Sequence, residues 1–405
     1  MNSRIGVGMV GYAFMGKAHS QAWRNVHRFF DPPVTPDLVA LCGRDRQRAT
    51  EAAATLGWAH VETDWRELVG RDDVRLVDVC TPGDTHAEIA LAALAAGKHV
   101  LCEKPLSNSV AEAEEMTAAA EAAAAAHGTV AMVGFNYRRV PAIALARELV
   151  ADGRIGEVRH VRALYLQDWI VDPQFPLVWR LERDKAGSGA LGDIGAHIVD
   201  LAQYVTGELI TGVSAQTETF VRERPLPAAS SGLAADSNGS GTGRVTVDDC
   251  AVFTARLTGG GMATFEATRF ATGRKNAMRL ELNGSLGSLA FDFESMNELH
   301  FHDDTEPAET AGFRRILVTE PGHPYVAGWW PAGHGLGYEH AFTHQAYDLL
   351  TAIGHGRTVH PTFRDGLQVQ RVLDAVERSA ADGSRFTAVD GVGDTVAGAV
   401  VTAAG

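Results

Sequence analysis

The sequence predicts an α/β fold, in which an N-terminal, doubly wound parallel sheet precedes an α+β domain with a large, mostly antiparallel open sheet. The chain has 405 residues, 45% of them hydrophobic, which is enough for two well-buried domains. Its first third alternates short apolar strands with helical segments, the pattern of a parallel sheet with helices on both faces. After about Arg139, strand-like runs follow one another with few helices between them, which indicates antiparallel pairing.

The pattern divides the chain into a parallel-sheet domain at residues 1–137, an α+β domain at 138–388 and a flexible tail at 389–405. Apolar runs predict strands in the first domain at residues 4–10, 37–42, 75–80, 99–102 and 129–134. Helices are predicted at residues 46–56, 86–96 and 110–127, closed by Gly57, Gly97 and Gly128, because glycine adopts the left-handed conformation that ends a helix.

The second domain reads as a series of strand-like runs from Val158 to Phe293, with one helix around residues 194–205. Helical patterns return at residues 338–353 and 364–380, where they pack across the second sheet or back on the first domain. Residues 225–243 are rich in Gly, Ser and Ala and predict a mobile loop between two strands.

Composition excludes several classes of partner. Lys and Arg number 36 against 50 Asp and Glu, a net charge of −14 without a basic run, so we expect no nucleic-acid partner. No stretch approaches the ~18 apolar residues of a membrane span, so we expect no membrane association. The four cysteines lie in apolar runs without CxxC spacing, which is typical of reduced core residues in a cytoplasmic protein.

A glycine-rich turn after the first strand is a candidate dinucleotide site. A literal G-x-G-x-x-G match begins at Gly6 but lies inside the strand, whereas the frame from Gly11 to Gly16 follows the strand and opens a helix. In that frame Gly11 permits the tight turn, Gly16 allows close packing, and N–H groups near Phe14 and Met15 point at a pyrophosphate. The alternative is a glycine-rich turn without a ligand.

The end of the second strand bears on cofactor choice. A ribose-binding carboxylate is expected there, but the chain has Gly43 and Arg44, with Asp45 one position late. Arg44 is a candidate contact for a 2′-phosphate or adenine, or an ordinary solvated side chain. Ala13, in place of the middle glycine of the motif, adds a methyl group where the cofactor approaches. NAD and NADP both stay open.

Two further segments carry candidate catalytic groups. Lys104 follows an apolar strand, at the edge where doubly wound folds hold ligands. Asp193 and His197 are four residues apart, on one face of a predicted helix. Taken singly, the lysine could be solvated, and the pair could be a helix-start carboxylate and a buried histidine.

Taken together, these motifs resemble the Gfo/Idh/MocA oxidoreductase family over about residues 5–380. The resemblance rests on five motifs in this order: Gly11-x4-Gly16-x2-His19, Thr81-Pro82 followed by His86, Glu103-Lys104-Pro105, Asn136-Tyr137-Arg138 and Gly192-Asp193-x3-His197-x2-Asp200.

The resemblance implies an N-terminal Rossmann domain, a second domain whose open sheet often mediates dimers or tetramers, and NAD(P) as cofactor. A narrower similarity to sugar dehydrogenases of the family favours NAD. It also implies that the nicotinamide lies over Lys104, Asp193 and His197. The predicted cofactor contacts are Gly11, Phe14, Met15, Gly16, Arg44, Thr81, Pro82, His86, Glu103, Lys104 and Asn136.

The implied reaction is hydride transfer between the nicotinamide and a secondary alcohol of a sugar, anhydrosugar or inositol. A carbinol carbon loses hydride only as its hydroxyl proton is removed, so the site needs a base. Lys104 and His197 are the candidates, and Asp193 orients the substrate. Aromatic and polar side chains suit a polyhydroxylated ring, and the predicted contacts are Arg138, Tyr165, Gln167, Asp168, Trp179 and Arg180. No HExxH or clustered Cys/His pattern predicts a metal.

Two other functions fit the same resemblance. Some relatives keep NAD bound and cleave a glycosidic bond through transient oxidation at a sugar C3. Others sense sugars without catalysis, because a fold does not dictate a function. The presence of Lys104, Asp193 and His197 favours the dehydrogenase.

Overall fold

The structure is a computed structural model that describes residues 3–227, 229–231, 234–236 and 241–392. The chain forms two compact units. The first comprises residues 1–139, 229–235 and 337–367, and the second comprises residues 140–228, 236–336 and 368–405. Among the helices of the described residues, none has the length and apolar character needed to cross a bilayer.

The first unit is built on a six-stranded sheet in the order β3-β2-β1-β4-β5-β6. All its strand pairs are parallel, as the alternation of strands and helices predicted. This is the strand order of a Rossmann fold. The strands are β1 (Ser3–Val10), β2 (Val34–Cys42), β3 (His60–Glu62), β4 (Leu76–Val79), β5 (His99–Cys102) and β6 (Ala131–Val133).

Local signals account for the ends of the predicted helices. Ser109 caps the first turn of α5 by accepting a hydrogen bond from the backbone N–H of Glu112, and Gly128 ends the helix in the left-handed conformation. The helices of this unit are α1 (Phe14–Phe29), α2 (Arg46–Leu56), α3 (Trp65–Gly70), α4 (His86–Ala95), α5 (Val110–His127) and α9 (His340–His355). Of the two placements predicted for the segment at 338–353, the structure shows the one on the first unit: Phe342 and Leu349 of α9 share a core with Val7 and Trp23.

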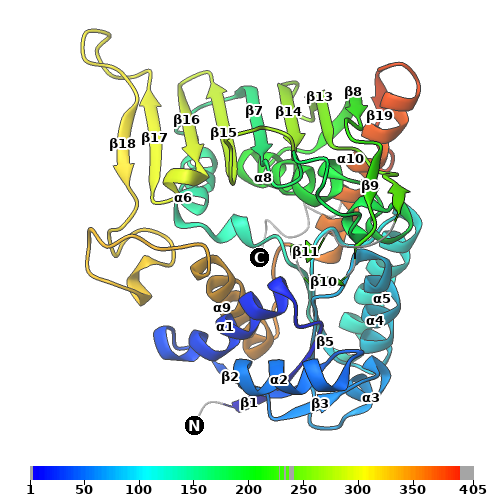
Figure 1. The fold of residues 1–405 in the computed structure, drawn as a ribbon. Helices are drawn as coiled ribbons and strands as arrows, with labels where there is room; N and C mark the ends of the chain where they lie inside the picture. The colour runs from blue at the N-terminus through cyan, green and yellow to red at the C-terminus, as the bar shows by residue number, and fades with distance from the viewer. Residues whose placement is uncertain (1–2, 228, 232–233, 237–240, 393–405) are drawn as a thin grey trace. The chain divides into compact units, whose positions relative to one another are not determined.

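The second unit is built on a nine-stranded sheet in the order β18-β17-β16-β15-β7-β14-β13-β8-β19, seen from left to right in Figure 1. Its pairs are antiparallel except for β7 with β14. The strands are β7 (Val158–Leu166), β8 (Ile210–Glu218), β13 (Cys250–Leu257), β14 (Met262–Thr268), β15 (Ala277–Gly284), β16 (Gly287–Asp292), β17 (Glu298–Asp303), β18 (Arg314–Leu317) and β19 (Thr387–Ala388).

Helices lie against part of this sheet. Helix α6 (Pro141–Ala151) contacts β16 and β17, and α8 (Ala196–Thr206) contacts β7 and β15. Residues of β13 alternate between buried and exposed, with Phe253 buried and Val252 half exposed. One face of the sheet therefore belongs to the core and the other faces outward. Helix α10 (Phe363–Ala381) begins in the first unit and continues in the second.

The two segments predicted to be irregular contain regular or anchored backbone where the structure describes them. As predicted, the segment at 225–243 connects two strands, because β12 (Thr242–Arg244) pairs with β9 (Glu223–Pro225), but it also contains β10 (Ala229–Ser231) and β11 (Ala234–Asp236). At the predicted tail, Val389 is buried and its N–H donates to the carbonyl of Thr211, so residues 389–392 are anchored. The rest of the tail, and residues 228, 232–233 and 237–240, lie outside the described residues.

Candidate active site

The glycine turn between β1 and α1 has the geometry that a dinucleotide site needs. Gly11 has φ +100°, and a Cβ there would lie 2.7 Å from the carbonyl oxygen of Cys80. A Cβ on Gly16 would lie 2.3 Å from the carbonyl oxygen of Gly11, so the helix packs closely on the turn. Helix α1 begins at Phe14 without a side-chain cap at Ala13, and its first-turn N–H groups can bind an anion. As predicted, the motif starts at Gly11, because Gly6 and Gly8 lie inside β1.

The end of β2 is shaped by an aromatic ring. A Cβ on Gly43 would lie 2.0 Å from the ring of Tyr12, so glycine is the residue that fits. The next residue, Arg44, is exposed. Asp45 caps α2 by accepting a hydrogen bond from the N–H of Arg48, which gives this carboxylate a structural partner.

The predicted contacts after β4 form a braced loop. The ring nitrogens of His86 lie 2.9 Å from the carbonyl oxygen of Thr81 and 3.0 Å from that of Pro105. His86 therefore joins the loop that holds Thr81 and Pro82 to the loop that follows β5. Asn136 is buried in a short 3₁₀ turn after β6.

Lys104 stands two residues after the end of β5, as predicted. The preceding Glu103 is buried, and its Oε2 accepts a hydrogen bond from the backbone N–H of Lys104 at 3.2 Å. Its other oxygen lies 2.9 Å from Nε2 of His19. The buried carboxylate of Glu103 therefore contacts both the backbone N–H of Lys104 and the ring of His19.

Arg138 lies in the first unit, unlike the other predicted substrate contacts. It is 6% exposed, and its guanidinium lies 3.4 Å from the carboxylate of Asp365. Burial acts to raise the pKa of Asp365, but Arg138 and His360 outweigh it and hold that pKa well below its usual range. The pair is therefore charged and could present a fixed guanidinium edge.

Asp193 and His197 lie in the second unit, where the backbone departs from the predicted regular helix. Asp193 is part of a π-helical turn (Leu191–Gly195), and His197 lies in the first turn of α8. Such π-turns are rare and occur often at functional sites. His197 is 6% exposed, and the Asp193 side chain is 28% exposed.

Next to Asp193 is a fully buried guanidinium that the sequence analysis did not single out. Nη1 of Arg269 lies 3.7 Å from Oδ2 of Asp193, which is an ion pair but longer than a hydrogen bond. Nη2 donates to the carbonyl of Asp248 at 3.2 Å, and the guanidinium lies over the ring of Trp169. Among the residues that the structure describes, Nε and Nη1 of Arg269 have no hydrogen-bond partner. The carboxylate of Asp193 therefore faces a buried, incompletely satisfied cation.

The predicted substrate contacts of the second unit divide into two groups. Tyr165 and Gln167 both donate to Oδ1 of Asn276 at 2.8 Å, and the ring of Tyr165 lies 6.1 Å from that of His197. Asp168 instead accepts hydrogen bonds from Lys275 and the N–H of Gly273, and Lys275 contributes most to lowering its pKa. Asp168 thus fastens a loop, whereas Tyr165 and Gln167 belong to a polar cluster beside His197.

Trp179 and Arg180 stack on each other in a 3₁₀ turn, with the guanidinium 4.4 Å from the ring centroid. Burial lowers the pKa of Arg180, and Asp193 acts in the opposite direction. Arg180 therefore interacts electrostatically with the predicted substrate-orienting carboxylate.

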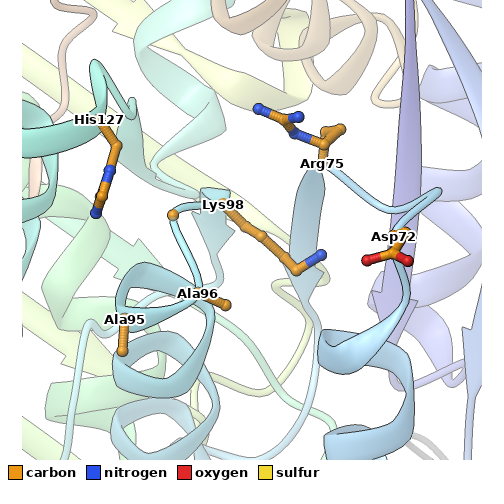
Figure 2. Close-up of a pocket in the computed structure, with 7 residues that line it drawn as sticks. Asp72, Arg75, Ala95, Ala96, Lys98 and His127 are labelled. Atoms are coloured by element: carbon orange, nitrogen blue, oxygen red, sulfur yellow. The ribbon is translucent and has the colours of Figure 1, made fainter.

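The first unit also has an open hollow of about 480 Å³, drawn in Figure 2. It is lined by Asp72, Arg75, residues 95–97, Lys98 and His127. Lys98 donates to the carbonyls of Arg71 and Val74. Arg75 and Lys98 immediately precede β4 and β5, so this hollow lies at the amino ends of the strands and Lys104 lies at the opposite edge. The hollow is not part of the predicted site.

The structure places Lys104 in the first unit and Asp193 with His197 in the second, and their meeting in one site stays a prediction. His19, Asp78 and Asn276 had no role predicted from the sequence. A signal for one of them was available, because a carboxylate such as Asp78 inside a buried apolar strand requires a partner.

Comparison with known proteins defines the class. Residues 5–135 match the family described as "Oxidoreductase family, NAD-binding Rossmann fold", and residues 143–290 match the GFO/IDH/MocA C-terminal domain. The protein is an oxidoreductase with an NAD-binding Rossmann domain. It belongs to the Gfo/Idh/MocA family, as the sequence motifs predicted.

Individual relatives match over nearly the whole chain. Levoglucosan dehydrogenase of Pseudarthrobacter phenanthrenivorans is 41% identical over 381 residues, which cover 93% of this chain and 96% of that protein. The crystal structure of an oxidoreductase domain protein from Kribbella flavida is 66% identical with a TM-score of 0.91, covering 96% of this chain and 99% of that one. Levoglucosan dehydrogenase in complex with NADH and levoglucosan is 39% identical with a TM-score of 0.89, at the same coverage.

Proposed function

We propose that the protein is an NAD(P)-dependent dehydrogenase that transfers hydride between the nicotinamide and a secondary alcohol of a sugar, an anhydrosugar or an inositol. The observation that carries the proposal is the position of Lys104, at the carboxyl edge of the NAD-binding sheet, where such folds hold their ligands. The likeness to levoglucosan dehydrogenase makes an anhydrosugar the first substrate to test.

The residues of this chain fit the cofactor. The turn from Gly11 to Gly16 has no room for side chains at either glycine, and it leads into a helix N-terminus without a side-chain cap. When bound, the cofactor supplies the acceptor or donor of the hydride. The first-turn N–H groups near Phe14 and Met15 hold its pyrophosphate. The solved NADH complex of a relative supports NAD, and the exposed Arg44 keeps NADP in the proposal.

The proposed mechanism assigns a proton to this chain's own groups. Lys104 and His197 remove the hydroxyl proton of the substrate as hydride leaves, and they return it in the reductive direction. A lysine is a base near neutral pH only where burial or a nearby positive charge favours its neutral form. Asp193, with Arg269 beside it, accepts hydrogen bonds from substrate hydroxyl groups.

Replacing Lys104 with Met tests the assignment. We expect turnover of the best sugar to fall by orders of magnitude while NAD still binds, measured by absorbance at the nicotinamide band and by calorimetric titration of NAD. Lys185→Met is the matched control, because Lys185 is exposed and pairs with Glu182. Near-normal turnover in Lys104→Met would rule the assignment out.

A substrate panel separates the dehydrogenase from its alternatives. Inositols, anhydrosugars, aldoses and glycosides are offered with each cofactor. A dehydrogenase produces NADH or NADPH in proportion to oxidised sugar, whereas a glycoside-cleaving relative releases free sugar without net reduction. A sugar sensor binds without turnover.

We also propose that a second copy of the chain covers the exposed face of the nine-stranded sheet. Val252 and Met262 on this face are 50% and 43% exposed, on the side opposite the buried Phe253 and Phe265. Light scattering is expected to show a dimer or tetramer, and Val252→Lys is expected to weaken it. A monomeric wild type would exclude this part of the proposal.

The free cysteines support a cytoplasmic location, which is part of the same proposal.

A further inference from the structure

Three buried ionisable side chains contact one another in the first unit, and one of them directly precedes Lys104. Its members are His19 on α1, Asp78 in β4 and Glu103 after β5, called here the His19 cluster. His19 is 1% exposed, Asp78 0% and Glu103 4%. Nδ1 of His19 lies 3.0 Å from both oxygens of Asp78, and Nε2 lies 2.9 Å from Oε1 of Glu103. Both ring nitrogens therefore face a carboxylate.

This geometry constrains the protonation of the ring. An ionised carboxylate only accepts hydrogen bonds, and a neutral imidazole has a single N–H to donate. Asp78 also accepts a hydrogen bond from Nε1 of Trp23 at 2.7 Å, and Glu103 accepts one from the N–H of Lys104. Each carboxylate therefore already acts as a hydrogen-bond acceptor. For both carboxylates to accept from the ring as well, the ring must carry an N–H at both nitrogens.

The electrostatics of the cluster agree with the geometry. Burial acts to lower the pKa of His19, but the interactions of the ring with Asp78 and Cys80 outweigh it, and the pKa is raised well above the usual value. The charged groups that face His19 from the packed elements are Asp78 of β4 and Glu103 after β5, with the Cys80 thiol beside them.

A metal ion is the competing explanation, because His19, Asp78 and Cys80 could each offer a ligand atom within 4.8 Å of the others. Metals bind the cysteine thiolate. Burial raises the pKa of the Cys80 thiol above its ordinary value, and its sulfur donates to Asp78 at 3.5 Å. A hydrogen-bonded ring accounts for these contacts without an ion.

We propose that His19 is a permanently protonated imidazolium that holds Glu103 in place and thereby positions Lys104. This inference rests on the role proposed above for Lys104. His19 follows the dinucleotide turn by one turn of α1, so the same side chain ties the cofactor-binding end of the helix to the strand that ends before Lys104. Glu103 fits because residue 134 is glycine: a Cβ there would lie 2.8 Å from Oε1. His19 is thus a positioning residue and does not itself touch substrate.

The protonation is tested without any substrate. Full-length protein is labelled with ¹⁵N-histidine, and the ring signals of His19 are identified by their loss in His19→Gln. We expect both ring nitrogens of His19 to stay protonated from pH 6 to pH 9, and to do so with no sugar present. A neutral ring anywhere in this range would overturn the proposal. Because this measurement does not depend on turnover, it stands or fails separately from the proposed dehydrogenase activity.

The positioning role is tested by kinetics. In His19→Gln the amide can donate to one carboxylate only and carries no charge. Because a displacement of about 1 Å can reduce a rate by roughly a hundredfold, we expect kcat to fall about tenfold to a hundredfold. The variant also removes a positive charge from the buried cluster that precedes Lys104, so we expect the pH dependence of kcat to change. A merely structural role would leave that pH dependence in place, and an unchanged profile with normal kcat would refute positioning.

Two variants keep the test decisive. If His19→Gln does not fold, Glu103→Gln preserves the shape of the cluster and removes the charge that the ring holds. In Glu103→Gln we expect the pH profile of kcat to change and the ring of His19 to lose a proton within the measured pH range. A ring that stays protonated together with an unchanged pH profile would count against the proposal. His27→Gln is the matched control on α1, and its kcat should equal that of the wild type.

Discussion

In the His19 cluster, the two carboxylates share a ring between them, and Trp23 and the backbone of Lys104 donate to the same carboxylates. In the second unit, the guanidinium of Arg269 is as deeply buried, yet its Nε and Nη1 find no hydrogen-bond partner in the described part of the chain, and Asp193 lies 3.7 Å away. A buried polar group without a partner costs about 1–3 kcal/mol. The first arrangement is complete within the protein, whereas the second keeps donors that a substrate oxygen or a shift of Asp193 could satisfy.

The two halves of the predicted site therefore differ in how completely the protein itself satisfies their hydrogen bonds. Rigid, fully hydrogen-bonded support fixes a catalytic group before the ligand arrives. A partly satisfied charge suits a group whose geometry tightens when ligand binds, because catalytic hydrogen bonds are often long without it. On this view Lys104 is fixed in advance, and Asp193 is completed by the substrate.

The largest expected effect follows from removing a member of the complete arrangement. Asp78→Leu leaves the buried ring of His19 and the indole N–H of Trp23 without their acceptor. Removing one partner of a buried charge pair typically costs about 3–5 kcal/mol, and we expect a loss of this size in urea unfolding. Asp78→Asn keeps the shape and should lose less. A loss below about 1 kcal/mol in Asp78→Leu would show that the cluster is not tightly coupled.

Arg269→Met should affect the molecule differently. It removes two buried nitrogens, Nε and Nη1, that have no hydrogen-bond partner among the described residues, so the stability loss should be smaller than in Asp78→Leu. We expect kcat/KM to fall by about tenfold to a hundredfold, since one weakened orienting contact is worth roughly 1–3 kcal/mol. Arg269→Lys keeps the charge and should recover part of the activity; unaltered kinetics in Arg269→Met would remove Arg269 from the site.

Elements with strong local signals could be predicted from the sequence. Helix α5 begins and ends where Ser109 and Gly128 predict, and Lys104 lies at the predicted strand end. Strand β3 and helix α3 were not predicted. The three residues of β3 (His60–Glu62) have no apolar alternation, and the strand exists because it pairs with β2. The pairing of β9 with β12 depends in the same way on a partner distant in the sequence.

The polar clusters could not be predicted from local sequence patterns, for the same reason. His19 is separated from Asp78 by 59 positions and from Glu103 by 84. Arg269 is equally remote from Asp193. Side-chain pairing over such separations leaves no periodic pattern, since it depends on which strand ends become neighbours. The catalytic candidates lie in motifs that can be recognised in the sequence, whereas the contacts of their supporting residues are visible only in the structure.

A second buried histidine of the first unit, His344, can be compared with His19 through the pH dependence of stability. Nδ1 of His344 lies 2.8 Å from the carbonyl oxygen of Arg139, and burial lowers the pKa of His344 to about 3. Between this value and the ordinary pKa of 6.5, the unfolded chain binds a proton that the folded chain does not. His344 therefore makes stability rise with pH in that window, by at most about 1.4 kcal/mol per pH unit. His19 has the opposite sign, because a raised pKa stabilises the fold below 6.5 and this contribution is lost as pH rises through the raised pKa.

The smallest expected effect is the loss of the His344 contribution. In His344→Gln the amide can still donate to the carbonyl of Arg139 but does not titrate. Between pH 5.5 and 6.5 we expect the unfolding free energy of the wild type to rise by about 1 kcal/mol more than that of the variant, as measured by urea unfolding at both pH values. His355→Gln, on an exposed residue at the end of α9, is the control and should follow the wild type. Equal slopes in wild type and His344→Gln would mean that His344 gains a proton in the folded state. In that case burial would not lower the pKa of His344, and it would not explain why the two histidines differ in their effect on stability.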